Sequence, residues 1–174
     1  APSPLVEGYL STLRPLTGVT ALGFSLGATV QILGLAAHEP ILRGVLRRLI
    51  VVQPFLGLTD ATKAAVRTLT AGSTDSVSYP IFEQMVAGSL VATRVTEAVR
   101  LLVTCGVPID IVFWPEDGFV GFDLIPSFEA VGATCHPIGL SGRPTGDAFK
   151  DHLAVAFHEG VEQEILRLLG GTKE

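Results

Sequence analysis

Apolar runs that alternate with helix-forming stretches give this chain its organisation. Residues 19–22 are apolar and β-prone, and residues 28–37, ended by Pro40, have the composition of a helix. The alternation predicts an α/β fold in which helices flank a parallel sheet, connected by right-handed crossovers. The further strands expected are 46–53, 109–114 and 134–140, and the further helices are 5–13, 91–103, 127–131 and 155–169.

Residues 55–90 break this pattern. Glycine, serine and proline interrupt two weakly amphipathic pieces, around 61–69 and 81–86. We therefore expect a small helical cap inserted at 55–90 into a single domain that spans residues 1–174.

A serine stands between two glycines where the first apolar run meets its helix, in the sequence Gly23-Phe24-Ser25-Leu26-Gly27. A strand, a tight turn and a helix in this order are how a serine nucleophile is mounted. We expect a Cβ at either glycine to collide with the neighbouring strand or helix, and the serine backbone to be strained. Ser25 Oγ then points outward, with the amino end of the helix behind it.

The charge and hydropathy of the chain exclude two classes of function. Its net charge is −5, and its basic residues are scattered apart from Arg43, Arg47 and Arg48, so no electrostatic footprint for nucleic acid is present. The mean hydropathy is +0.49, and residues 18–37 are about as long as a membrane span. That stretch holds the glycine-flanked serine, Gln31 and threonines, so we expect no membrane span. The amino end has no signal-peptide pattern, and the expected location is cytoplasmic.

A serine hydroxyl is a weak nucleophile until a base takes its proton, and the base needs a carboxylate to orient it. Such groups collect at the carboxyl ends of parallel strands. Asp117 follows the third expected strand, and His152 follows the loop after the fourth, so the order along the chain is Ser25, Asp117, His152. Glu116 is the alternative acid. His158, about one helical turn further along, is the alternative base.

The other histidines and the cysteines favour structural roles. His38 lies where a helix ends and can interact with the helix dipole. His136, early in the fourth strand, is expected to be a hydrogen-bonded structural residue. Cys105 and Cys135 lack the spacing of metal ligands, and two free thiols are favoured over one disulfide. No cofactor or metal site is predicted.

From Gly18 to Leu169 the chain resembles the α/β-hydrolase family. The glycine-flanked serine resembles the family's nucleophile elbow, residues 113–120 its acid turn and Asp151-His152-Leu153 its histidine turn. The sequence departs from the family at Trp114-Pro115, where glycine is usual before the acid, and at Asp151, where glycine is usual before the histidine. The resemblance implies a partial α/β-hydrolase fold.

The function expected is that of a serine hydrolase of esterase, lipase or thioesterase type. Ser25 attacks the acyl carbonyl, His152 shuttles the proton, Asp117 orients His152, and the Leu26 N–H holds the oxyanion. The cap is expected to form an apolar acyl pocket. An acyltransferase with the same triad and a non-catalytic subunit that binds an apolar ligand or a protein are the alternatives. The substrate-binding residues expected are Phe24, Leu56, Leu58, Phe82 and Met85.

The part of the chain before the elbow is short compared with the family. The family's sheet has several strands there, and a loop after one of them donates the second oxyanion N–H. We therefore expect the chain to be the C-terminal part of a larger hydrolase and feeble alone, because one missing donor costs about 100- to 1000-fold in turnover. We also expect a second polypeptide, or a second copy of this chain, to cover the open edge of the 19–22 strand.

Overall fold

The fold is built on one sheet of parallel strands. The structure is a computed structural model that describes residues 18–39, 44–56, 60, 63–64, 89–140 and 145–170, with the side chains of 89–92 left out. Its four strands are β1 (Val19–Phe24), β2 (Leu46–Val52), β3 (Ile109–Phe113) and β4 (Thr134–Pro137). They lie in the order β1-β2-β3-β4, and each pair is parallel. The expected parallel α/β sheet is confirmed.

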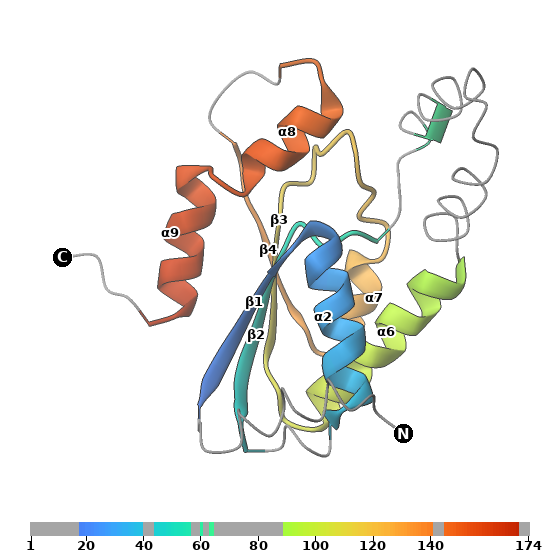
Figure 1. Cartoon of the computed structure of the whole chain (residues 1–174), viewed down its shortest axis with the longest axis vertical. Helices are drawn as coiled ribbons and strands as arrows, with labels where there is room; N and C mark the ends of the chain where they lie inside the picture. Colours follow the sequence, from blue (N-terminus) through green and yellow to red (C-terminus); the bar gives the residue numbers. More distant parts are fainter. Residues whose placement is uncertain are drawn as a thin grey trace, which may run out of the picture.

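Helices cover both faces of this sheet (Figure 1). One face carries α2 (Ser25–Ala37), α6 (Ser89–Thr104) and α7 (Ile125–Ala130), and the other carries α8 (Ala148–Val155) and α9 (Glu159–Leu168). Because successive strand side chains point to opposite faces, each central strand contributes to two cores. In β2, Leu49 and Val51 pack with α2 and α6, while Ile50 and Val52 pack with α8 and α9.

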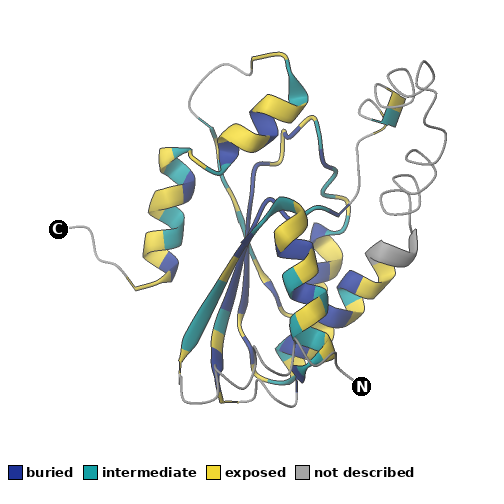
Figure 2. Ribbon diagram, in the orientation of Figure 1, coloured by how far each residue is buried: buried dark blue, intermediate teal, exposed yellow. Residues whose placement is uncertain are grey.

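The central strands are buried and the first strand is not (Figure 2). Every residue of β3 is buried, as a strand enclosed on both faces and both edges should be. By contrast, β1 pairs only with β2 among the described strands, in the register Ala21↔Leu49 and Gly23↔Val51. The side chain of Leu22 in β1 is half-exposed. Within the described sheet β1 is therefore an edge strand, as expected.

Several of the expected element boundaries need correction. Residues 148–155 form α8, a helix that was not expected, and the expected helix 155–169 is the separate α9. The fourth strand ends at Pro137 instead of continuing to 140, because its partner β3 ends at Phe113, the residue that pairs with Pro137. Helix α7 begins at Ile125, two residues earlier than expected, with Pro126 in its first turn. The expected helix 5–13 and most of the expected cap lie outside the described residues.

The apolar stretch 18–37 is divided between β1 and α2. Helix α2 has 13 residues, about 20 Å of helix, against about 30 Å for the hydrocarbon core of a bilayer. None of the helices in the described part of the chain is long and apolar enough to cross a membrane.

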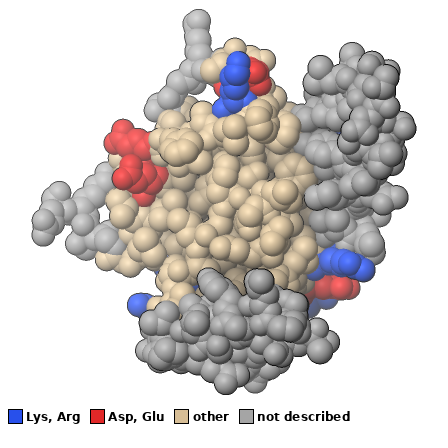
Figure 3. Space-filling model, viewed as in Figure 1, with Lys and Arg blue, Asp and Glu red and all other residues tan. Residues whose placement is uncertain are grey.

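Charged side chains are sparse on the face drawn in Figure 3. The described Lys and Arg side chains visible there are scattered, and some of them lie beside acidic side chains. Most of the described surface is uncharged. The described part of this face therefore has no basic patch of the kind that binds nucleic acid.

Candidate active site

The turn after β1 holds Ser25 in a left-handed backbone conformation, with φ +51°. The expected strain is confirmed, since this region is costly for any residue other than glycine. A Cβ on Gly23 would lie 2.8 Å from the Ala28 Cα and closer still to Gln31 Oε1, so only glycine fits there. The clash expected at Gly27 is wrong. Gly27 is exposed in the first turn of α2, and a Cβ added there meets nothing within 4 Å.

The three residues singled out in the sequence lie in a hydrogen-bonded row. Ser25 Oγ is 2.8 Å from His152 Nε2, and His152 Nδ1 is 2.6 Å from Asp117 Oδ2. The side chains of His152 and Asp117 are almost completely buried. A carboxylate can only accept, so Nδ1 carries the ring proton and Nε2 is left to accept from the Ser25 hydroxyl. This is the tautomer that a base for serine needs.

All three residues come from the carboxyl ends of strands, as ligand and catalytic groups of parallel sheets do. Ser25 directly follows β1, and Asp117 lies in the loop after β3. His152 is in α8, after β4, so it lies on a helix and not in the turn that the family resemblance implied. The Asp147 side chain caps α8 by accepting from the N–H groups of Phe149 and Lys150, and this fixes where the helix begins.

Every oxygen of the Asp117 carboxylate is hydrogen-bonded. Oδ1 accepts from the backbone N–H of Phe119 at 2.7 Å and of Val120 at 3.1 Å. Oδ2 accepts from His152 and also from Gln53 Nε2 at 2.6 Å. Gln53 is not among the residues predicted from the sequence. The available signal was a polar residue between the apolar run 49–52 and Pro54.

The alternative acid and base lie elsewhere. Glu116 is exposed, on the turn before Asp117. His158 is the N-cap of α9, where its Nδ1 accepts from the Gly160 N–H at 3.1 Å. His136 has the structural role expected, since its two ring nitrogens lie 2.9 Å from Asp110 Oδ1 and 3.0 Å from Glu164 Oε1.

The helix start behind Ser25 supplies backbone donors. Leu26 is the second residue of α2, so its N–H is among the first four of the helix, which have no partner within it. The first turn of α2 is tied to the segment after β2: Phe55 N–H donates to the Ser25 carbonyl at 3.1 Å, and Thr29 Oγ1 donates to the Phe55 carbonyl at 2.6 Å. These bonds fix the turn from which the Leu26 N–H projects.

Aromatic rings surround His152. The ring centroids of Phe119 and Phe24 lie 5.2 and 5.5 Å from that of His152. Phe119 in turn contacts Phe149 of α8 at 5.1 Å and Phe55 at 6.4 Å. We call Phe24, Phe55, Phe119 and Phe149 the aromatic cluster. Phe149 is half-exposed, so the cluster extends from the buried imidazole to the surface.

Of the other residues expected to bind substrate, Leu56 is the one that the structure describes. Leu56 is buried in the core beside α2 and α6, a placement that favours a packing role. Leu58, Phe82 and Met85 lie outside the described residues.

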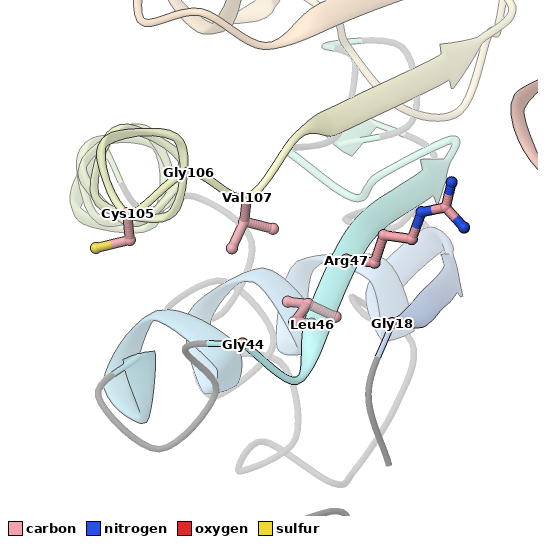
Figure 4. Close-up of a pocket in the computed structure, with 7 residues that line it drawn as sticks. All are labelled: Gly18, Gly44, Leu46, Arg47, Cys105, Gly106 and Val107. Carbon is pink, nitrogen blue, oxygen red and sulfur yellow. The ribbon is translucent and has the colours of Figure 1, made fainter.

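A cavity of about 370 Å³ lies at the opposite, amino end of the sheet (Figure 4). It is lined by Gly18, Gly44, Leu46, Arg47, Cys105, Gly106 and Val107. It contains no residue of the Ser25 row. Within the described part of the chain, no group of three or more His, Cys, Asp or Glu is arranged to hold a metal ion.

Neither cysteine belongs to the site. Cys105 and Cys135 are free thiols, as expected. Burial, with a contribution from the nearby Glu129, raises the pKa of Cys135 to about 12. A thiol of that kind stays protonated and is a poor nucleophile at neutral pH. Ser25 is therefore the nucleophile candidate at this site.

Solved structures share this architecture. The chain matches MGS-MChE2, an alpha/beta hydrolase enzyme from the metagenome of sediments of the lagoon of Mar Chica, Morocco, with a TM-score of 0.51 and 16% identity over 95% of this chain and 68% of that one. It matches a lipase-esterase related protein from Clostridium acetobutylicum with a TM-score of 0.51 and 14% identity over 93% of this chain and 74% of that one. The chain has an α/β-hydrolase fold. No family model matches the sequence, and no curated protein matches it. The α/β-hydrolase fold expected from the elbow and the two turns is thus shown by the structure, while the chemistry depends on the site.

Proposed function

We propose that this α/β-hydrolase-fold protein is a serine hydrolase that cleaves hydrophobic acyl esters or thioesters through an acyl-enzyme on Ser25. The observation that carries the proposal is the row of two short hydrogen bonds, 2.8 Å from Ser25 Oγ to His152 Nε2 and 2.6 Å from His152 Nδ1 to Asp117 Oδ2. The two matched structures, an alpha/beta hydrolase enzyme and a lipase-esterase related protein, agree with it.

The chemistry begins when Ser25 Oγ attacks the acyl carbonyl and His152 Nε2 takes the hydroxyl proton. Asp117 stabilises the imidazolium that forms. The carbonyl oxygen becomes an oxyanion, and the Leu26 N–H at the start of α2 is the proposed donor to it. His152 then gives the proton to the leaving alcohol or thiol, which departs as the acyl-enzyme forms. Water, activated by the same imidazole, releases the acid and restores Ser25.

The aromatic cluster supports an apolar acyl substrate. Phe24 and Phe119 contact His152, and Phe149 continues the apolar surface outward. Leu26 and Leu153 are also about half-exposed beside Ser25 and His152 in the sequence. Apolar surface of this kind contributes about 25 cal/mol for each square ångström that an acyl chain covers. A charged or strongly polar acyl group would lose its hydration there without a compensating partner.

A fluorophosphonate probe tests the nucleophile directly. We expect the probe to label the protein and Ser25→Ala to abolish labelling while the circular dichroism spectrum is unchanged. Ser127→Ala, at an exposed serine of α7, is the matched control and should label like the wild type. Labelling of Ser25→Ala at the wild-type level would overturn the assignment of Ser25. Absence of labelling in the wild type would favour a non-catalytic subunit that binds an apolar ligand.

A further inference from the structure

Gln53 is a buried polar residue in an unusual backbone conformation, at the carboxyl end of β2. Its side chain is inaccessible to solvent, and its φ is +47°. The left-handed region is rare for residues other than glycine, and a residue is held there only when its surroundings require it. The surroundings here are the chain just after β3 and the Asp117 carboxylate.

The orientation of the Gln53 amide is fixed by its partners. Its Oε1 accepts from the backbone N–H of Trp114 at 2.7 Å, and that N–H can only donate. The NH₂ group must therefore face Asp117, whose Oδ2 lies 2.6 Å from Nε2. The flip that leaves glutamine amides ambiguous elsewhere would bring two donors together at Trp114 and two acceptors together at Asp117.

The Asp117 oxygen that Gln53 contacts is the one that contacts the histidine. Oδ2 accepts from both His152 Nδ1 and Gln53 Nε2, while Oδ1 is held by the loop backbone. A second donor on Oδ2 fixes the carboxylate plane and withdraws part of the negative charge that faces the imidazole.

We propose that Gln53 is a positioning residue for the reaction, one that orients Asp117 and moderates its interaction with His152. The inference rests on the proposed function for its role in catalysis, but the effect on His152 exists whether or not the protein turns over an ester. The carboxylates next to Asp117 and His152 in the sequence do not take the place of Asp117. Glu116 is exposed, and Asp151 of α8 accepts from the Thr145 N–H at 2.8 Å.

A purely structural role is the alternative, because Gln53 also links the ends of β2 and β3. The two roles differ in what they do to the proton of the His152–Asp117 pair. A link between strands changes stability and leaves the pair's titration where it was. A donor on Oδ2 competes with proton uptake, so its loss moves the pair's titration to higher pH, whichever of the two side chains carries the proton.

The test is an NMR titration of the His152 ring in the wild type and in Gln53→Met, which keeps the length of the side chain and removes both hydrogen bonds. We expect the His152 midpoint to rise by about one to two pH units. The acid limb of the pH profile for fluorophosphonate labelling should move in the same direction. If Gln53→Met does not fold, Gln53→Glu keeps an acceptor for Trp114 and places a second carboxyl group against Oδ2, which raises the midpoint further.

Thr29→Val is the matched control. It removes a buried hydrogen bond of 2.6 Å to the Phe55 carbonyl, close to the site but not on the row of Ser25, His152 and Asp117. It should lower stability and leave the His152 midpoint unchanged. An unchanged midpoint in both Gln53 variants would overturn the positioning role. If the midpoint moves but the wild type is not labelled, Gln53 acts on the pair as proposed and it is the hydrolase function that fails.

Discussion

Among the described residues other than glycine, Ser25 and Gln53 are the two with positive φ; Ser25 contacts the buried imidazole of His152, and Gln53 contacts the buried carboxylate of Asp117. They follow adjacent strands, β1 and β2, at the same end of the sheet. Such conformations cost about 1 to 3 kcal/mol each and tend to collect at functional sites. The position of the strain therefore agrees with the hydrogen-bonded row in marking this end of the sheet as the site.

Substitutions at the acid and base candidates separate the site from its sequence neighbours. We expect Asp117→Asn and His152→Ala to lose nearly as much esterase activity as Ser25→Ala, because members of such a unit act together and their effects are not additive. Glu116→Gln, at an exposed carboxylate, and His158→Ala, at the cap of α9, should keep most of the activity. Hydrolysis of a p-nitrophenyl ester measures the activity of all five variants.

Two patterns in that experiment would change the assignment. Activity that survives Asp117→Asn and is lost in Glu116→Gln would make Glu116 the acid. Activity that survives His152→Ala and is lost in His158→Ala would make His158 the base. His158→Ala carries its own positive control, since loss of the helix cap should lower the free energy of unfolding by about 1 kcal/mol.

At the residue scale, the sequence was sufficient where chemistry dictates both residue type and local geometry. Ser25 could be identified because a tight turn between a strand and a helix needs glycine at position 23. Asp117 and His152 could be placed because the carboxyl ends of parallel strands converge. Gln53 could not be identified, since a single glutamine at a strand end has the same appearance whether it faces solvent or a carboxylate. Its role depends on Asp117, 64 residues away.

At the scale of elements, the aromatic cluster is assembled from four separate segments: the end of β1, the chain after β2, the loop after β3 and α8. Phe149 is its most exposed member, because the other three side chains are only partly exposed. We expect p-nitrophenyl esters of medium-length acids to be cleaved faster than the acetate, with up to about 0.8 kcal/mol for each added methylene until the apolar surface is covered. Phe149→Ala should flatten this dependence.

Phe157→Ala provides the control for that series. Phe157 follows α8 and is 91% exposed, and it is not part of the aromatic cluster. Phe157→Ala removes a side chain of the same type as Phe149→Ala does, and it should leave the dependence of the rate on acyl length as in the wild type. A rate that is flat or falls from acetate onwards in the wild type would mean that the site has no acyl pocket.

Helix α9 is attached to the sheet by charged groups. His136 of β4 lies between Asp110 of β3 and Glu164 of α9, and Arg167 contacts Glu164 at 2.5 Å. Arg48 of β2 completes the group, with Nε 3.2 Å from Asp110 Oδ2. The Arg167 hydrogen bond, followed by the charges of Arg167 and His136, holds the pKa of Glu164 below its ordinary value.

The pH dependence of stability follows from that direction. A carboxylate with a lowered pKa in the folded state stabilises the fold above the pKa it has when unfolded, and this contribution is lost as the pH falls through the folded value. We expect the free energy of unfolding of the wild type to fall below about pH 4.5, and Glu164→Gln to make this decline shallower. Urea unfolding between pH 3 and 7 measures it. Glu162→Gln, on the same helix but exposed, should retain the wild-type decline.

Helix boundaries were the weakest part of the prediction from sequence, for a physical reason. Residues 141–147 have loop composition, and this hid the N-cap at Asp147 that begins α8. The break between α8 and α9 lies at His158, whose side chain caps α9. Histidine is not among the residues preferred at helix N-caps, so the sequence did not indicate this role. Strands 46–52 and 109–113 were predictable because β-branched apolar runs bounded by proline or glycine are typical of buried parallel strands.

At the scale of the whole molecule, β1 lies at the edge of the described sheet and has an open side away from β2. Val19 N–H donates to the Val45 carbonyl, and the Ser25 carbonyl accepts from Phe55 N–H, so the odd-numbered residues of this strand turn their backbone groups towards β2. The groups of Thr20, Leu22 and Phe24 therefore face the other side. The Leu22 carbonyl there accepts from Gln31 Nε2 of α2 at 3.1 Å. An uncharged strand with such an edge is a template for pairing.

We propose that a second polypeptide, or a second copy of this chain, pairs with the open edge of β1. The same partner would bring the second oxyanion donor, so association and esterase activity should appear together and be lost together. Leu22→Lys, which places a charge at the half-exposed centre of the edge, should weaken both, whereas Val30→Lys on the exposed face of α2 should leave both unchanged. Native mass spectrometry and light scattering report the association, and p-nitrophenyl ester hydrolysis reports the activity. A wild-type monomer with full esterase activity would show that this edge is covered from within the chain, and the proposed partner would then be wrong.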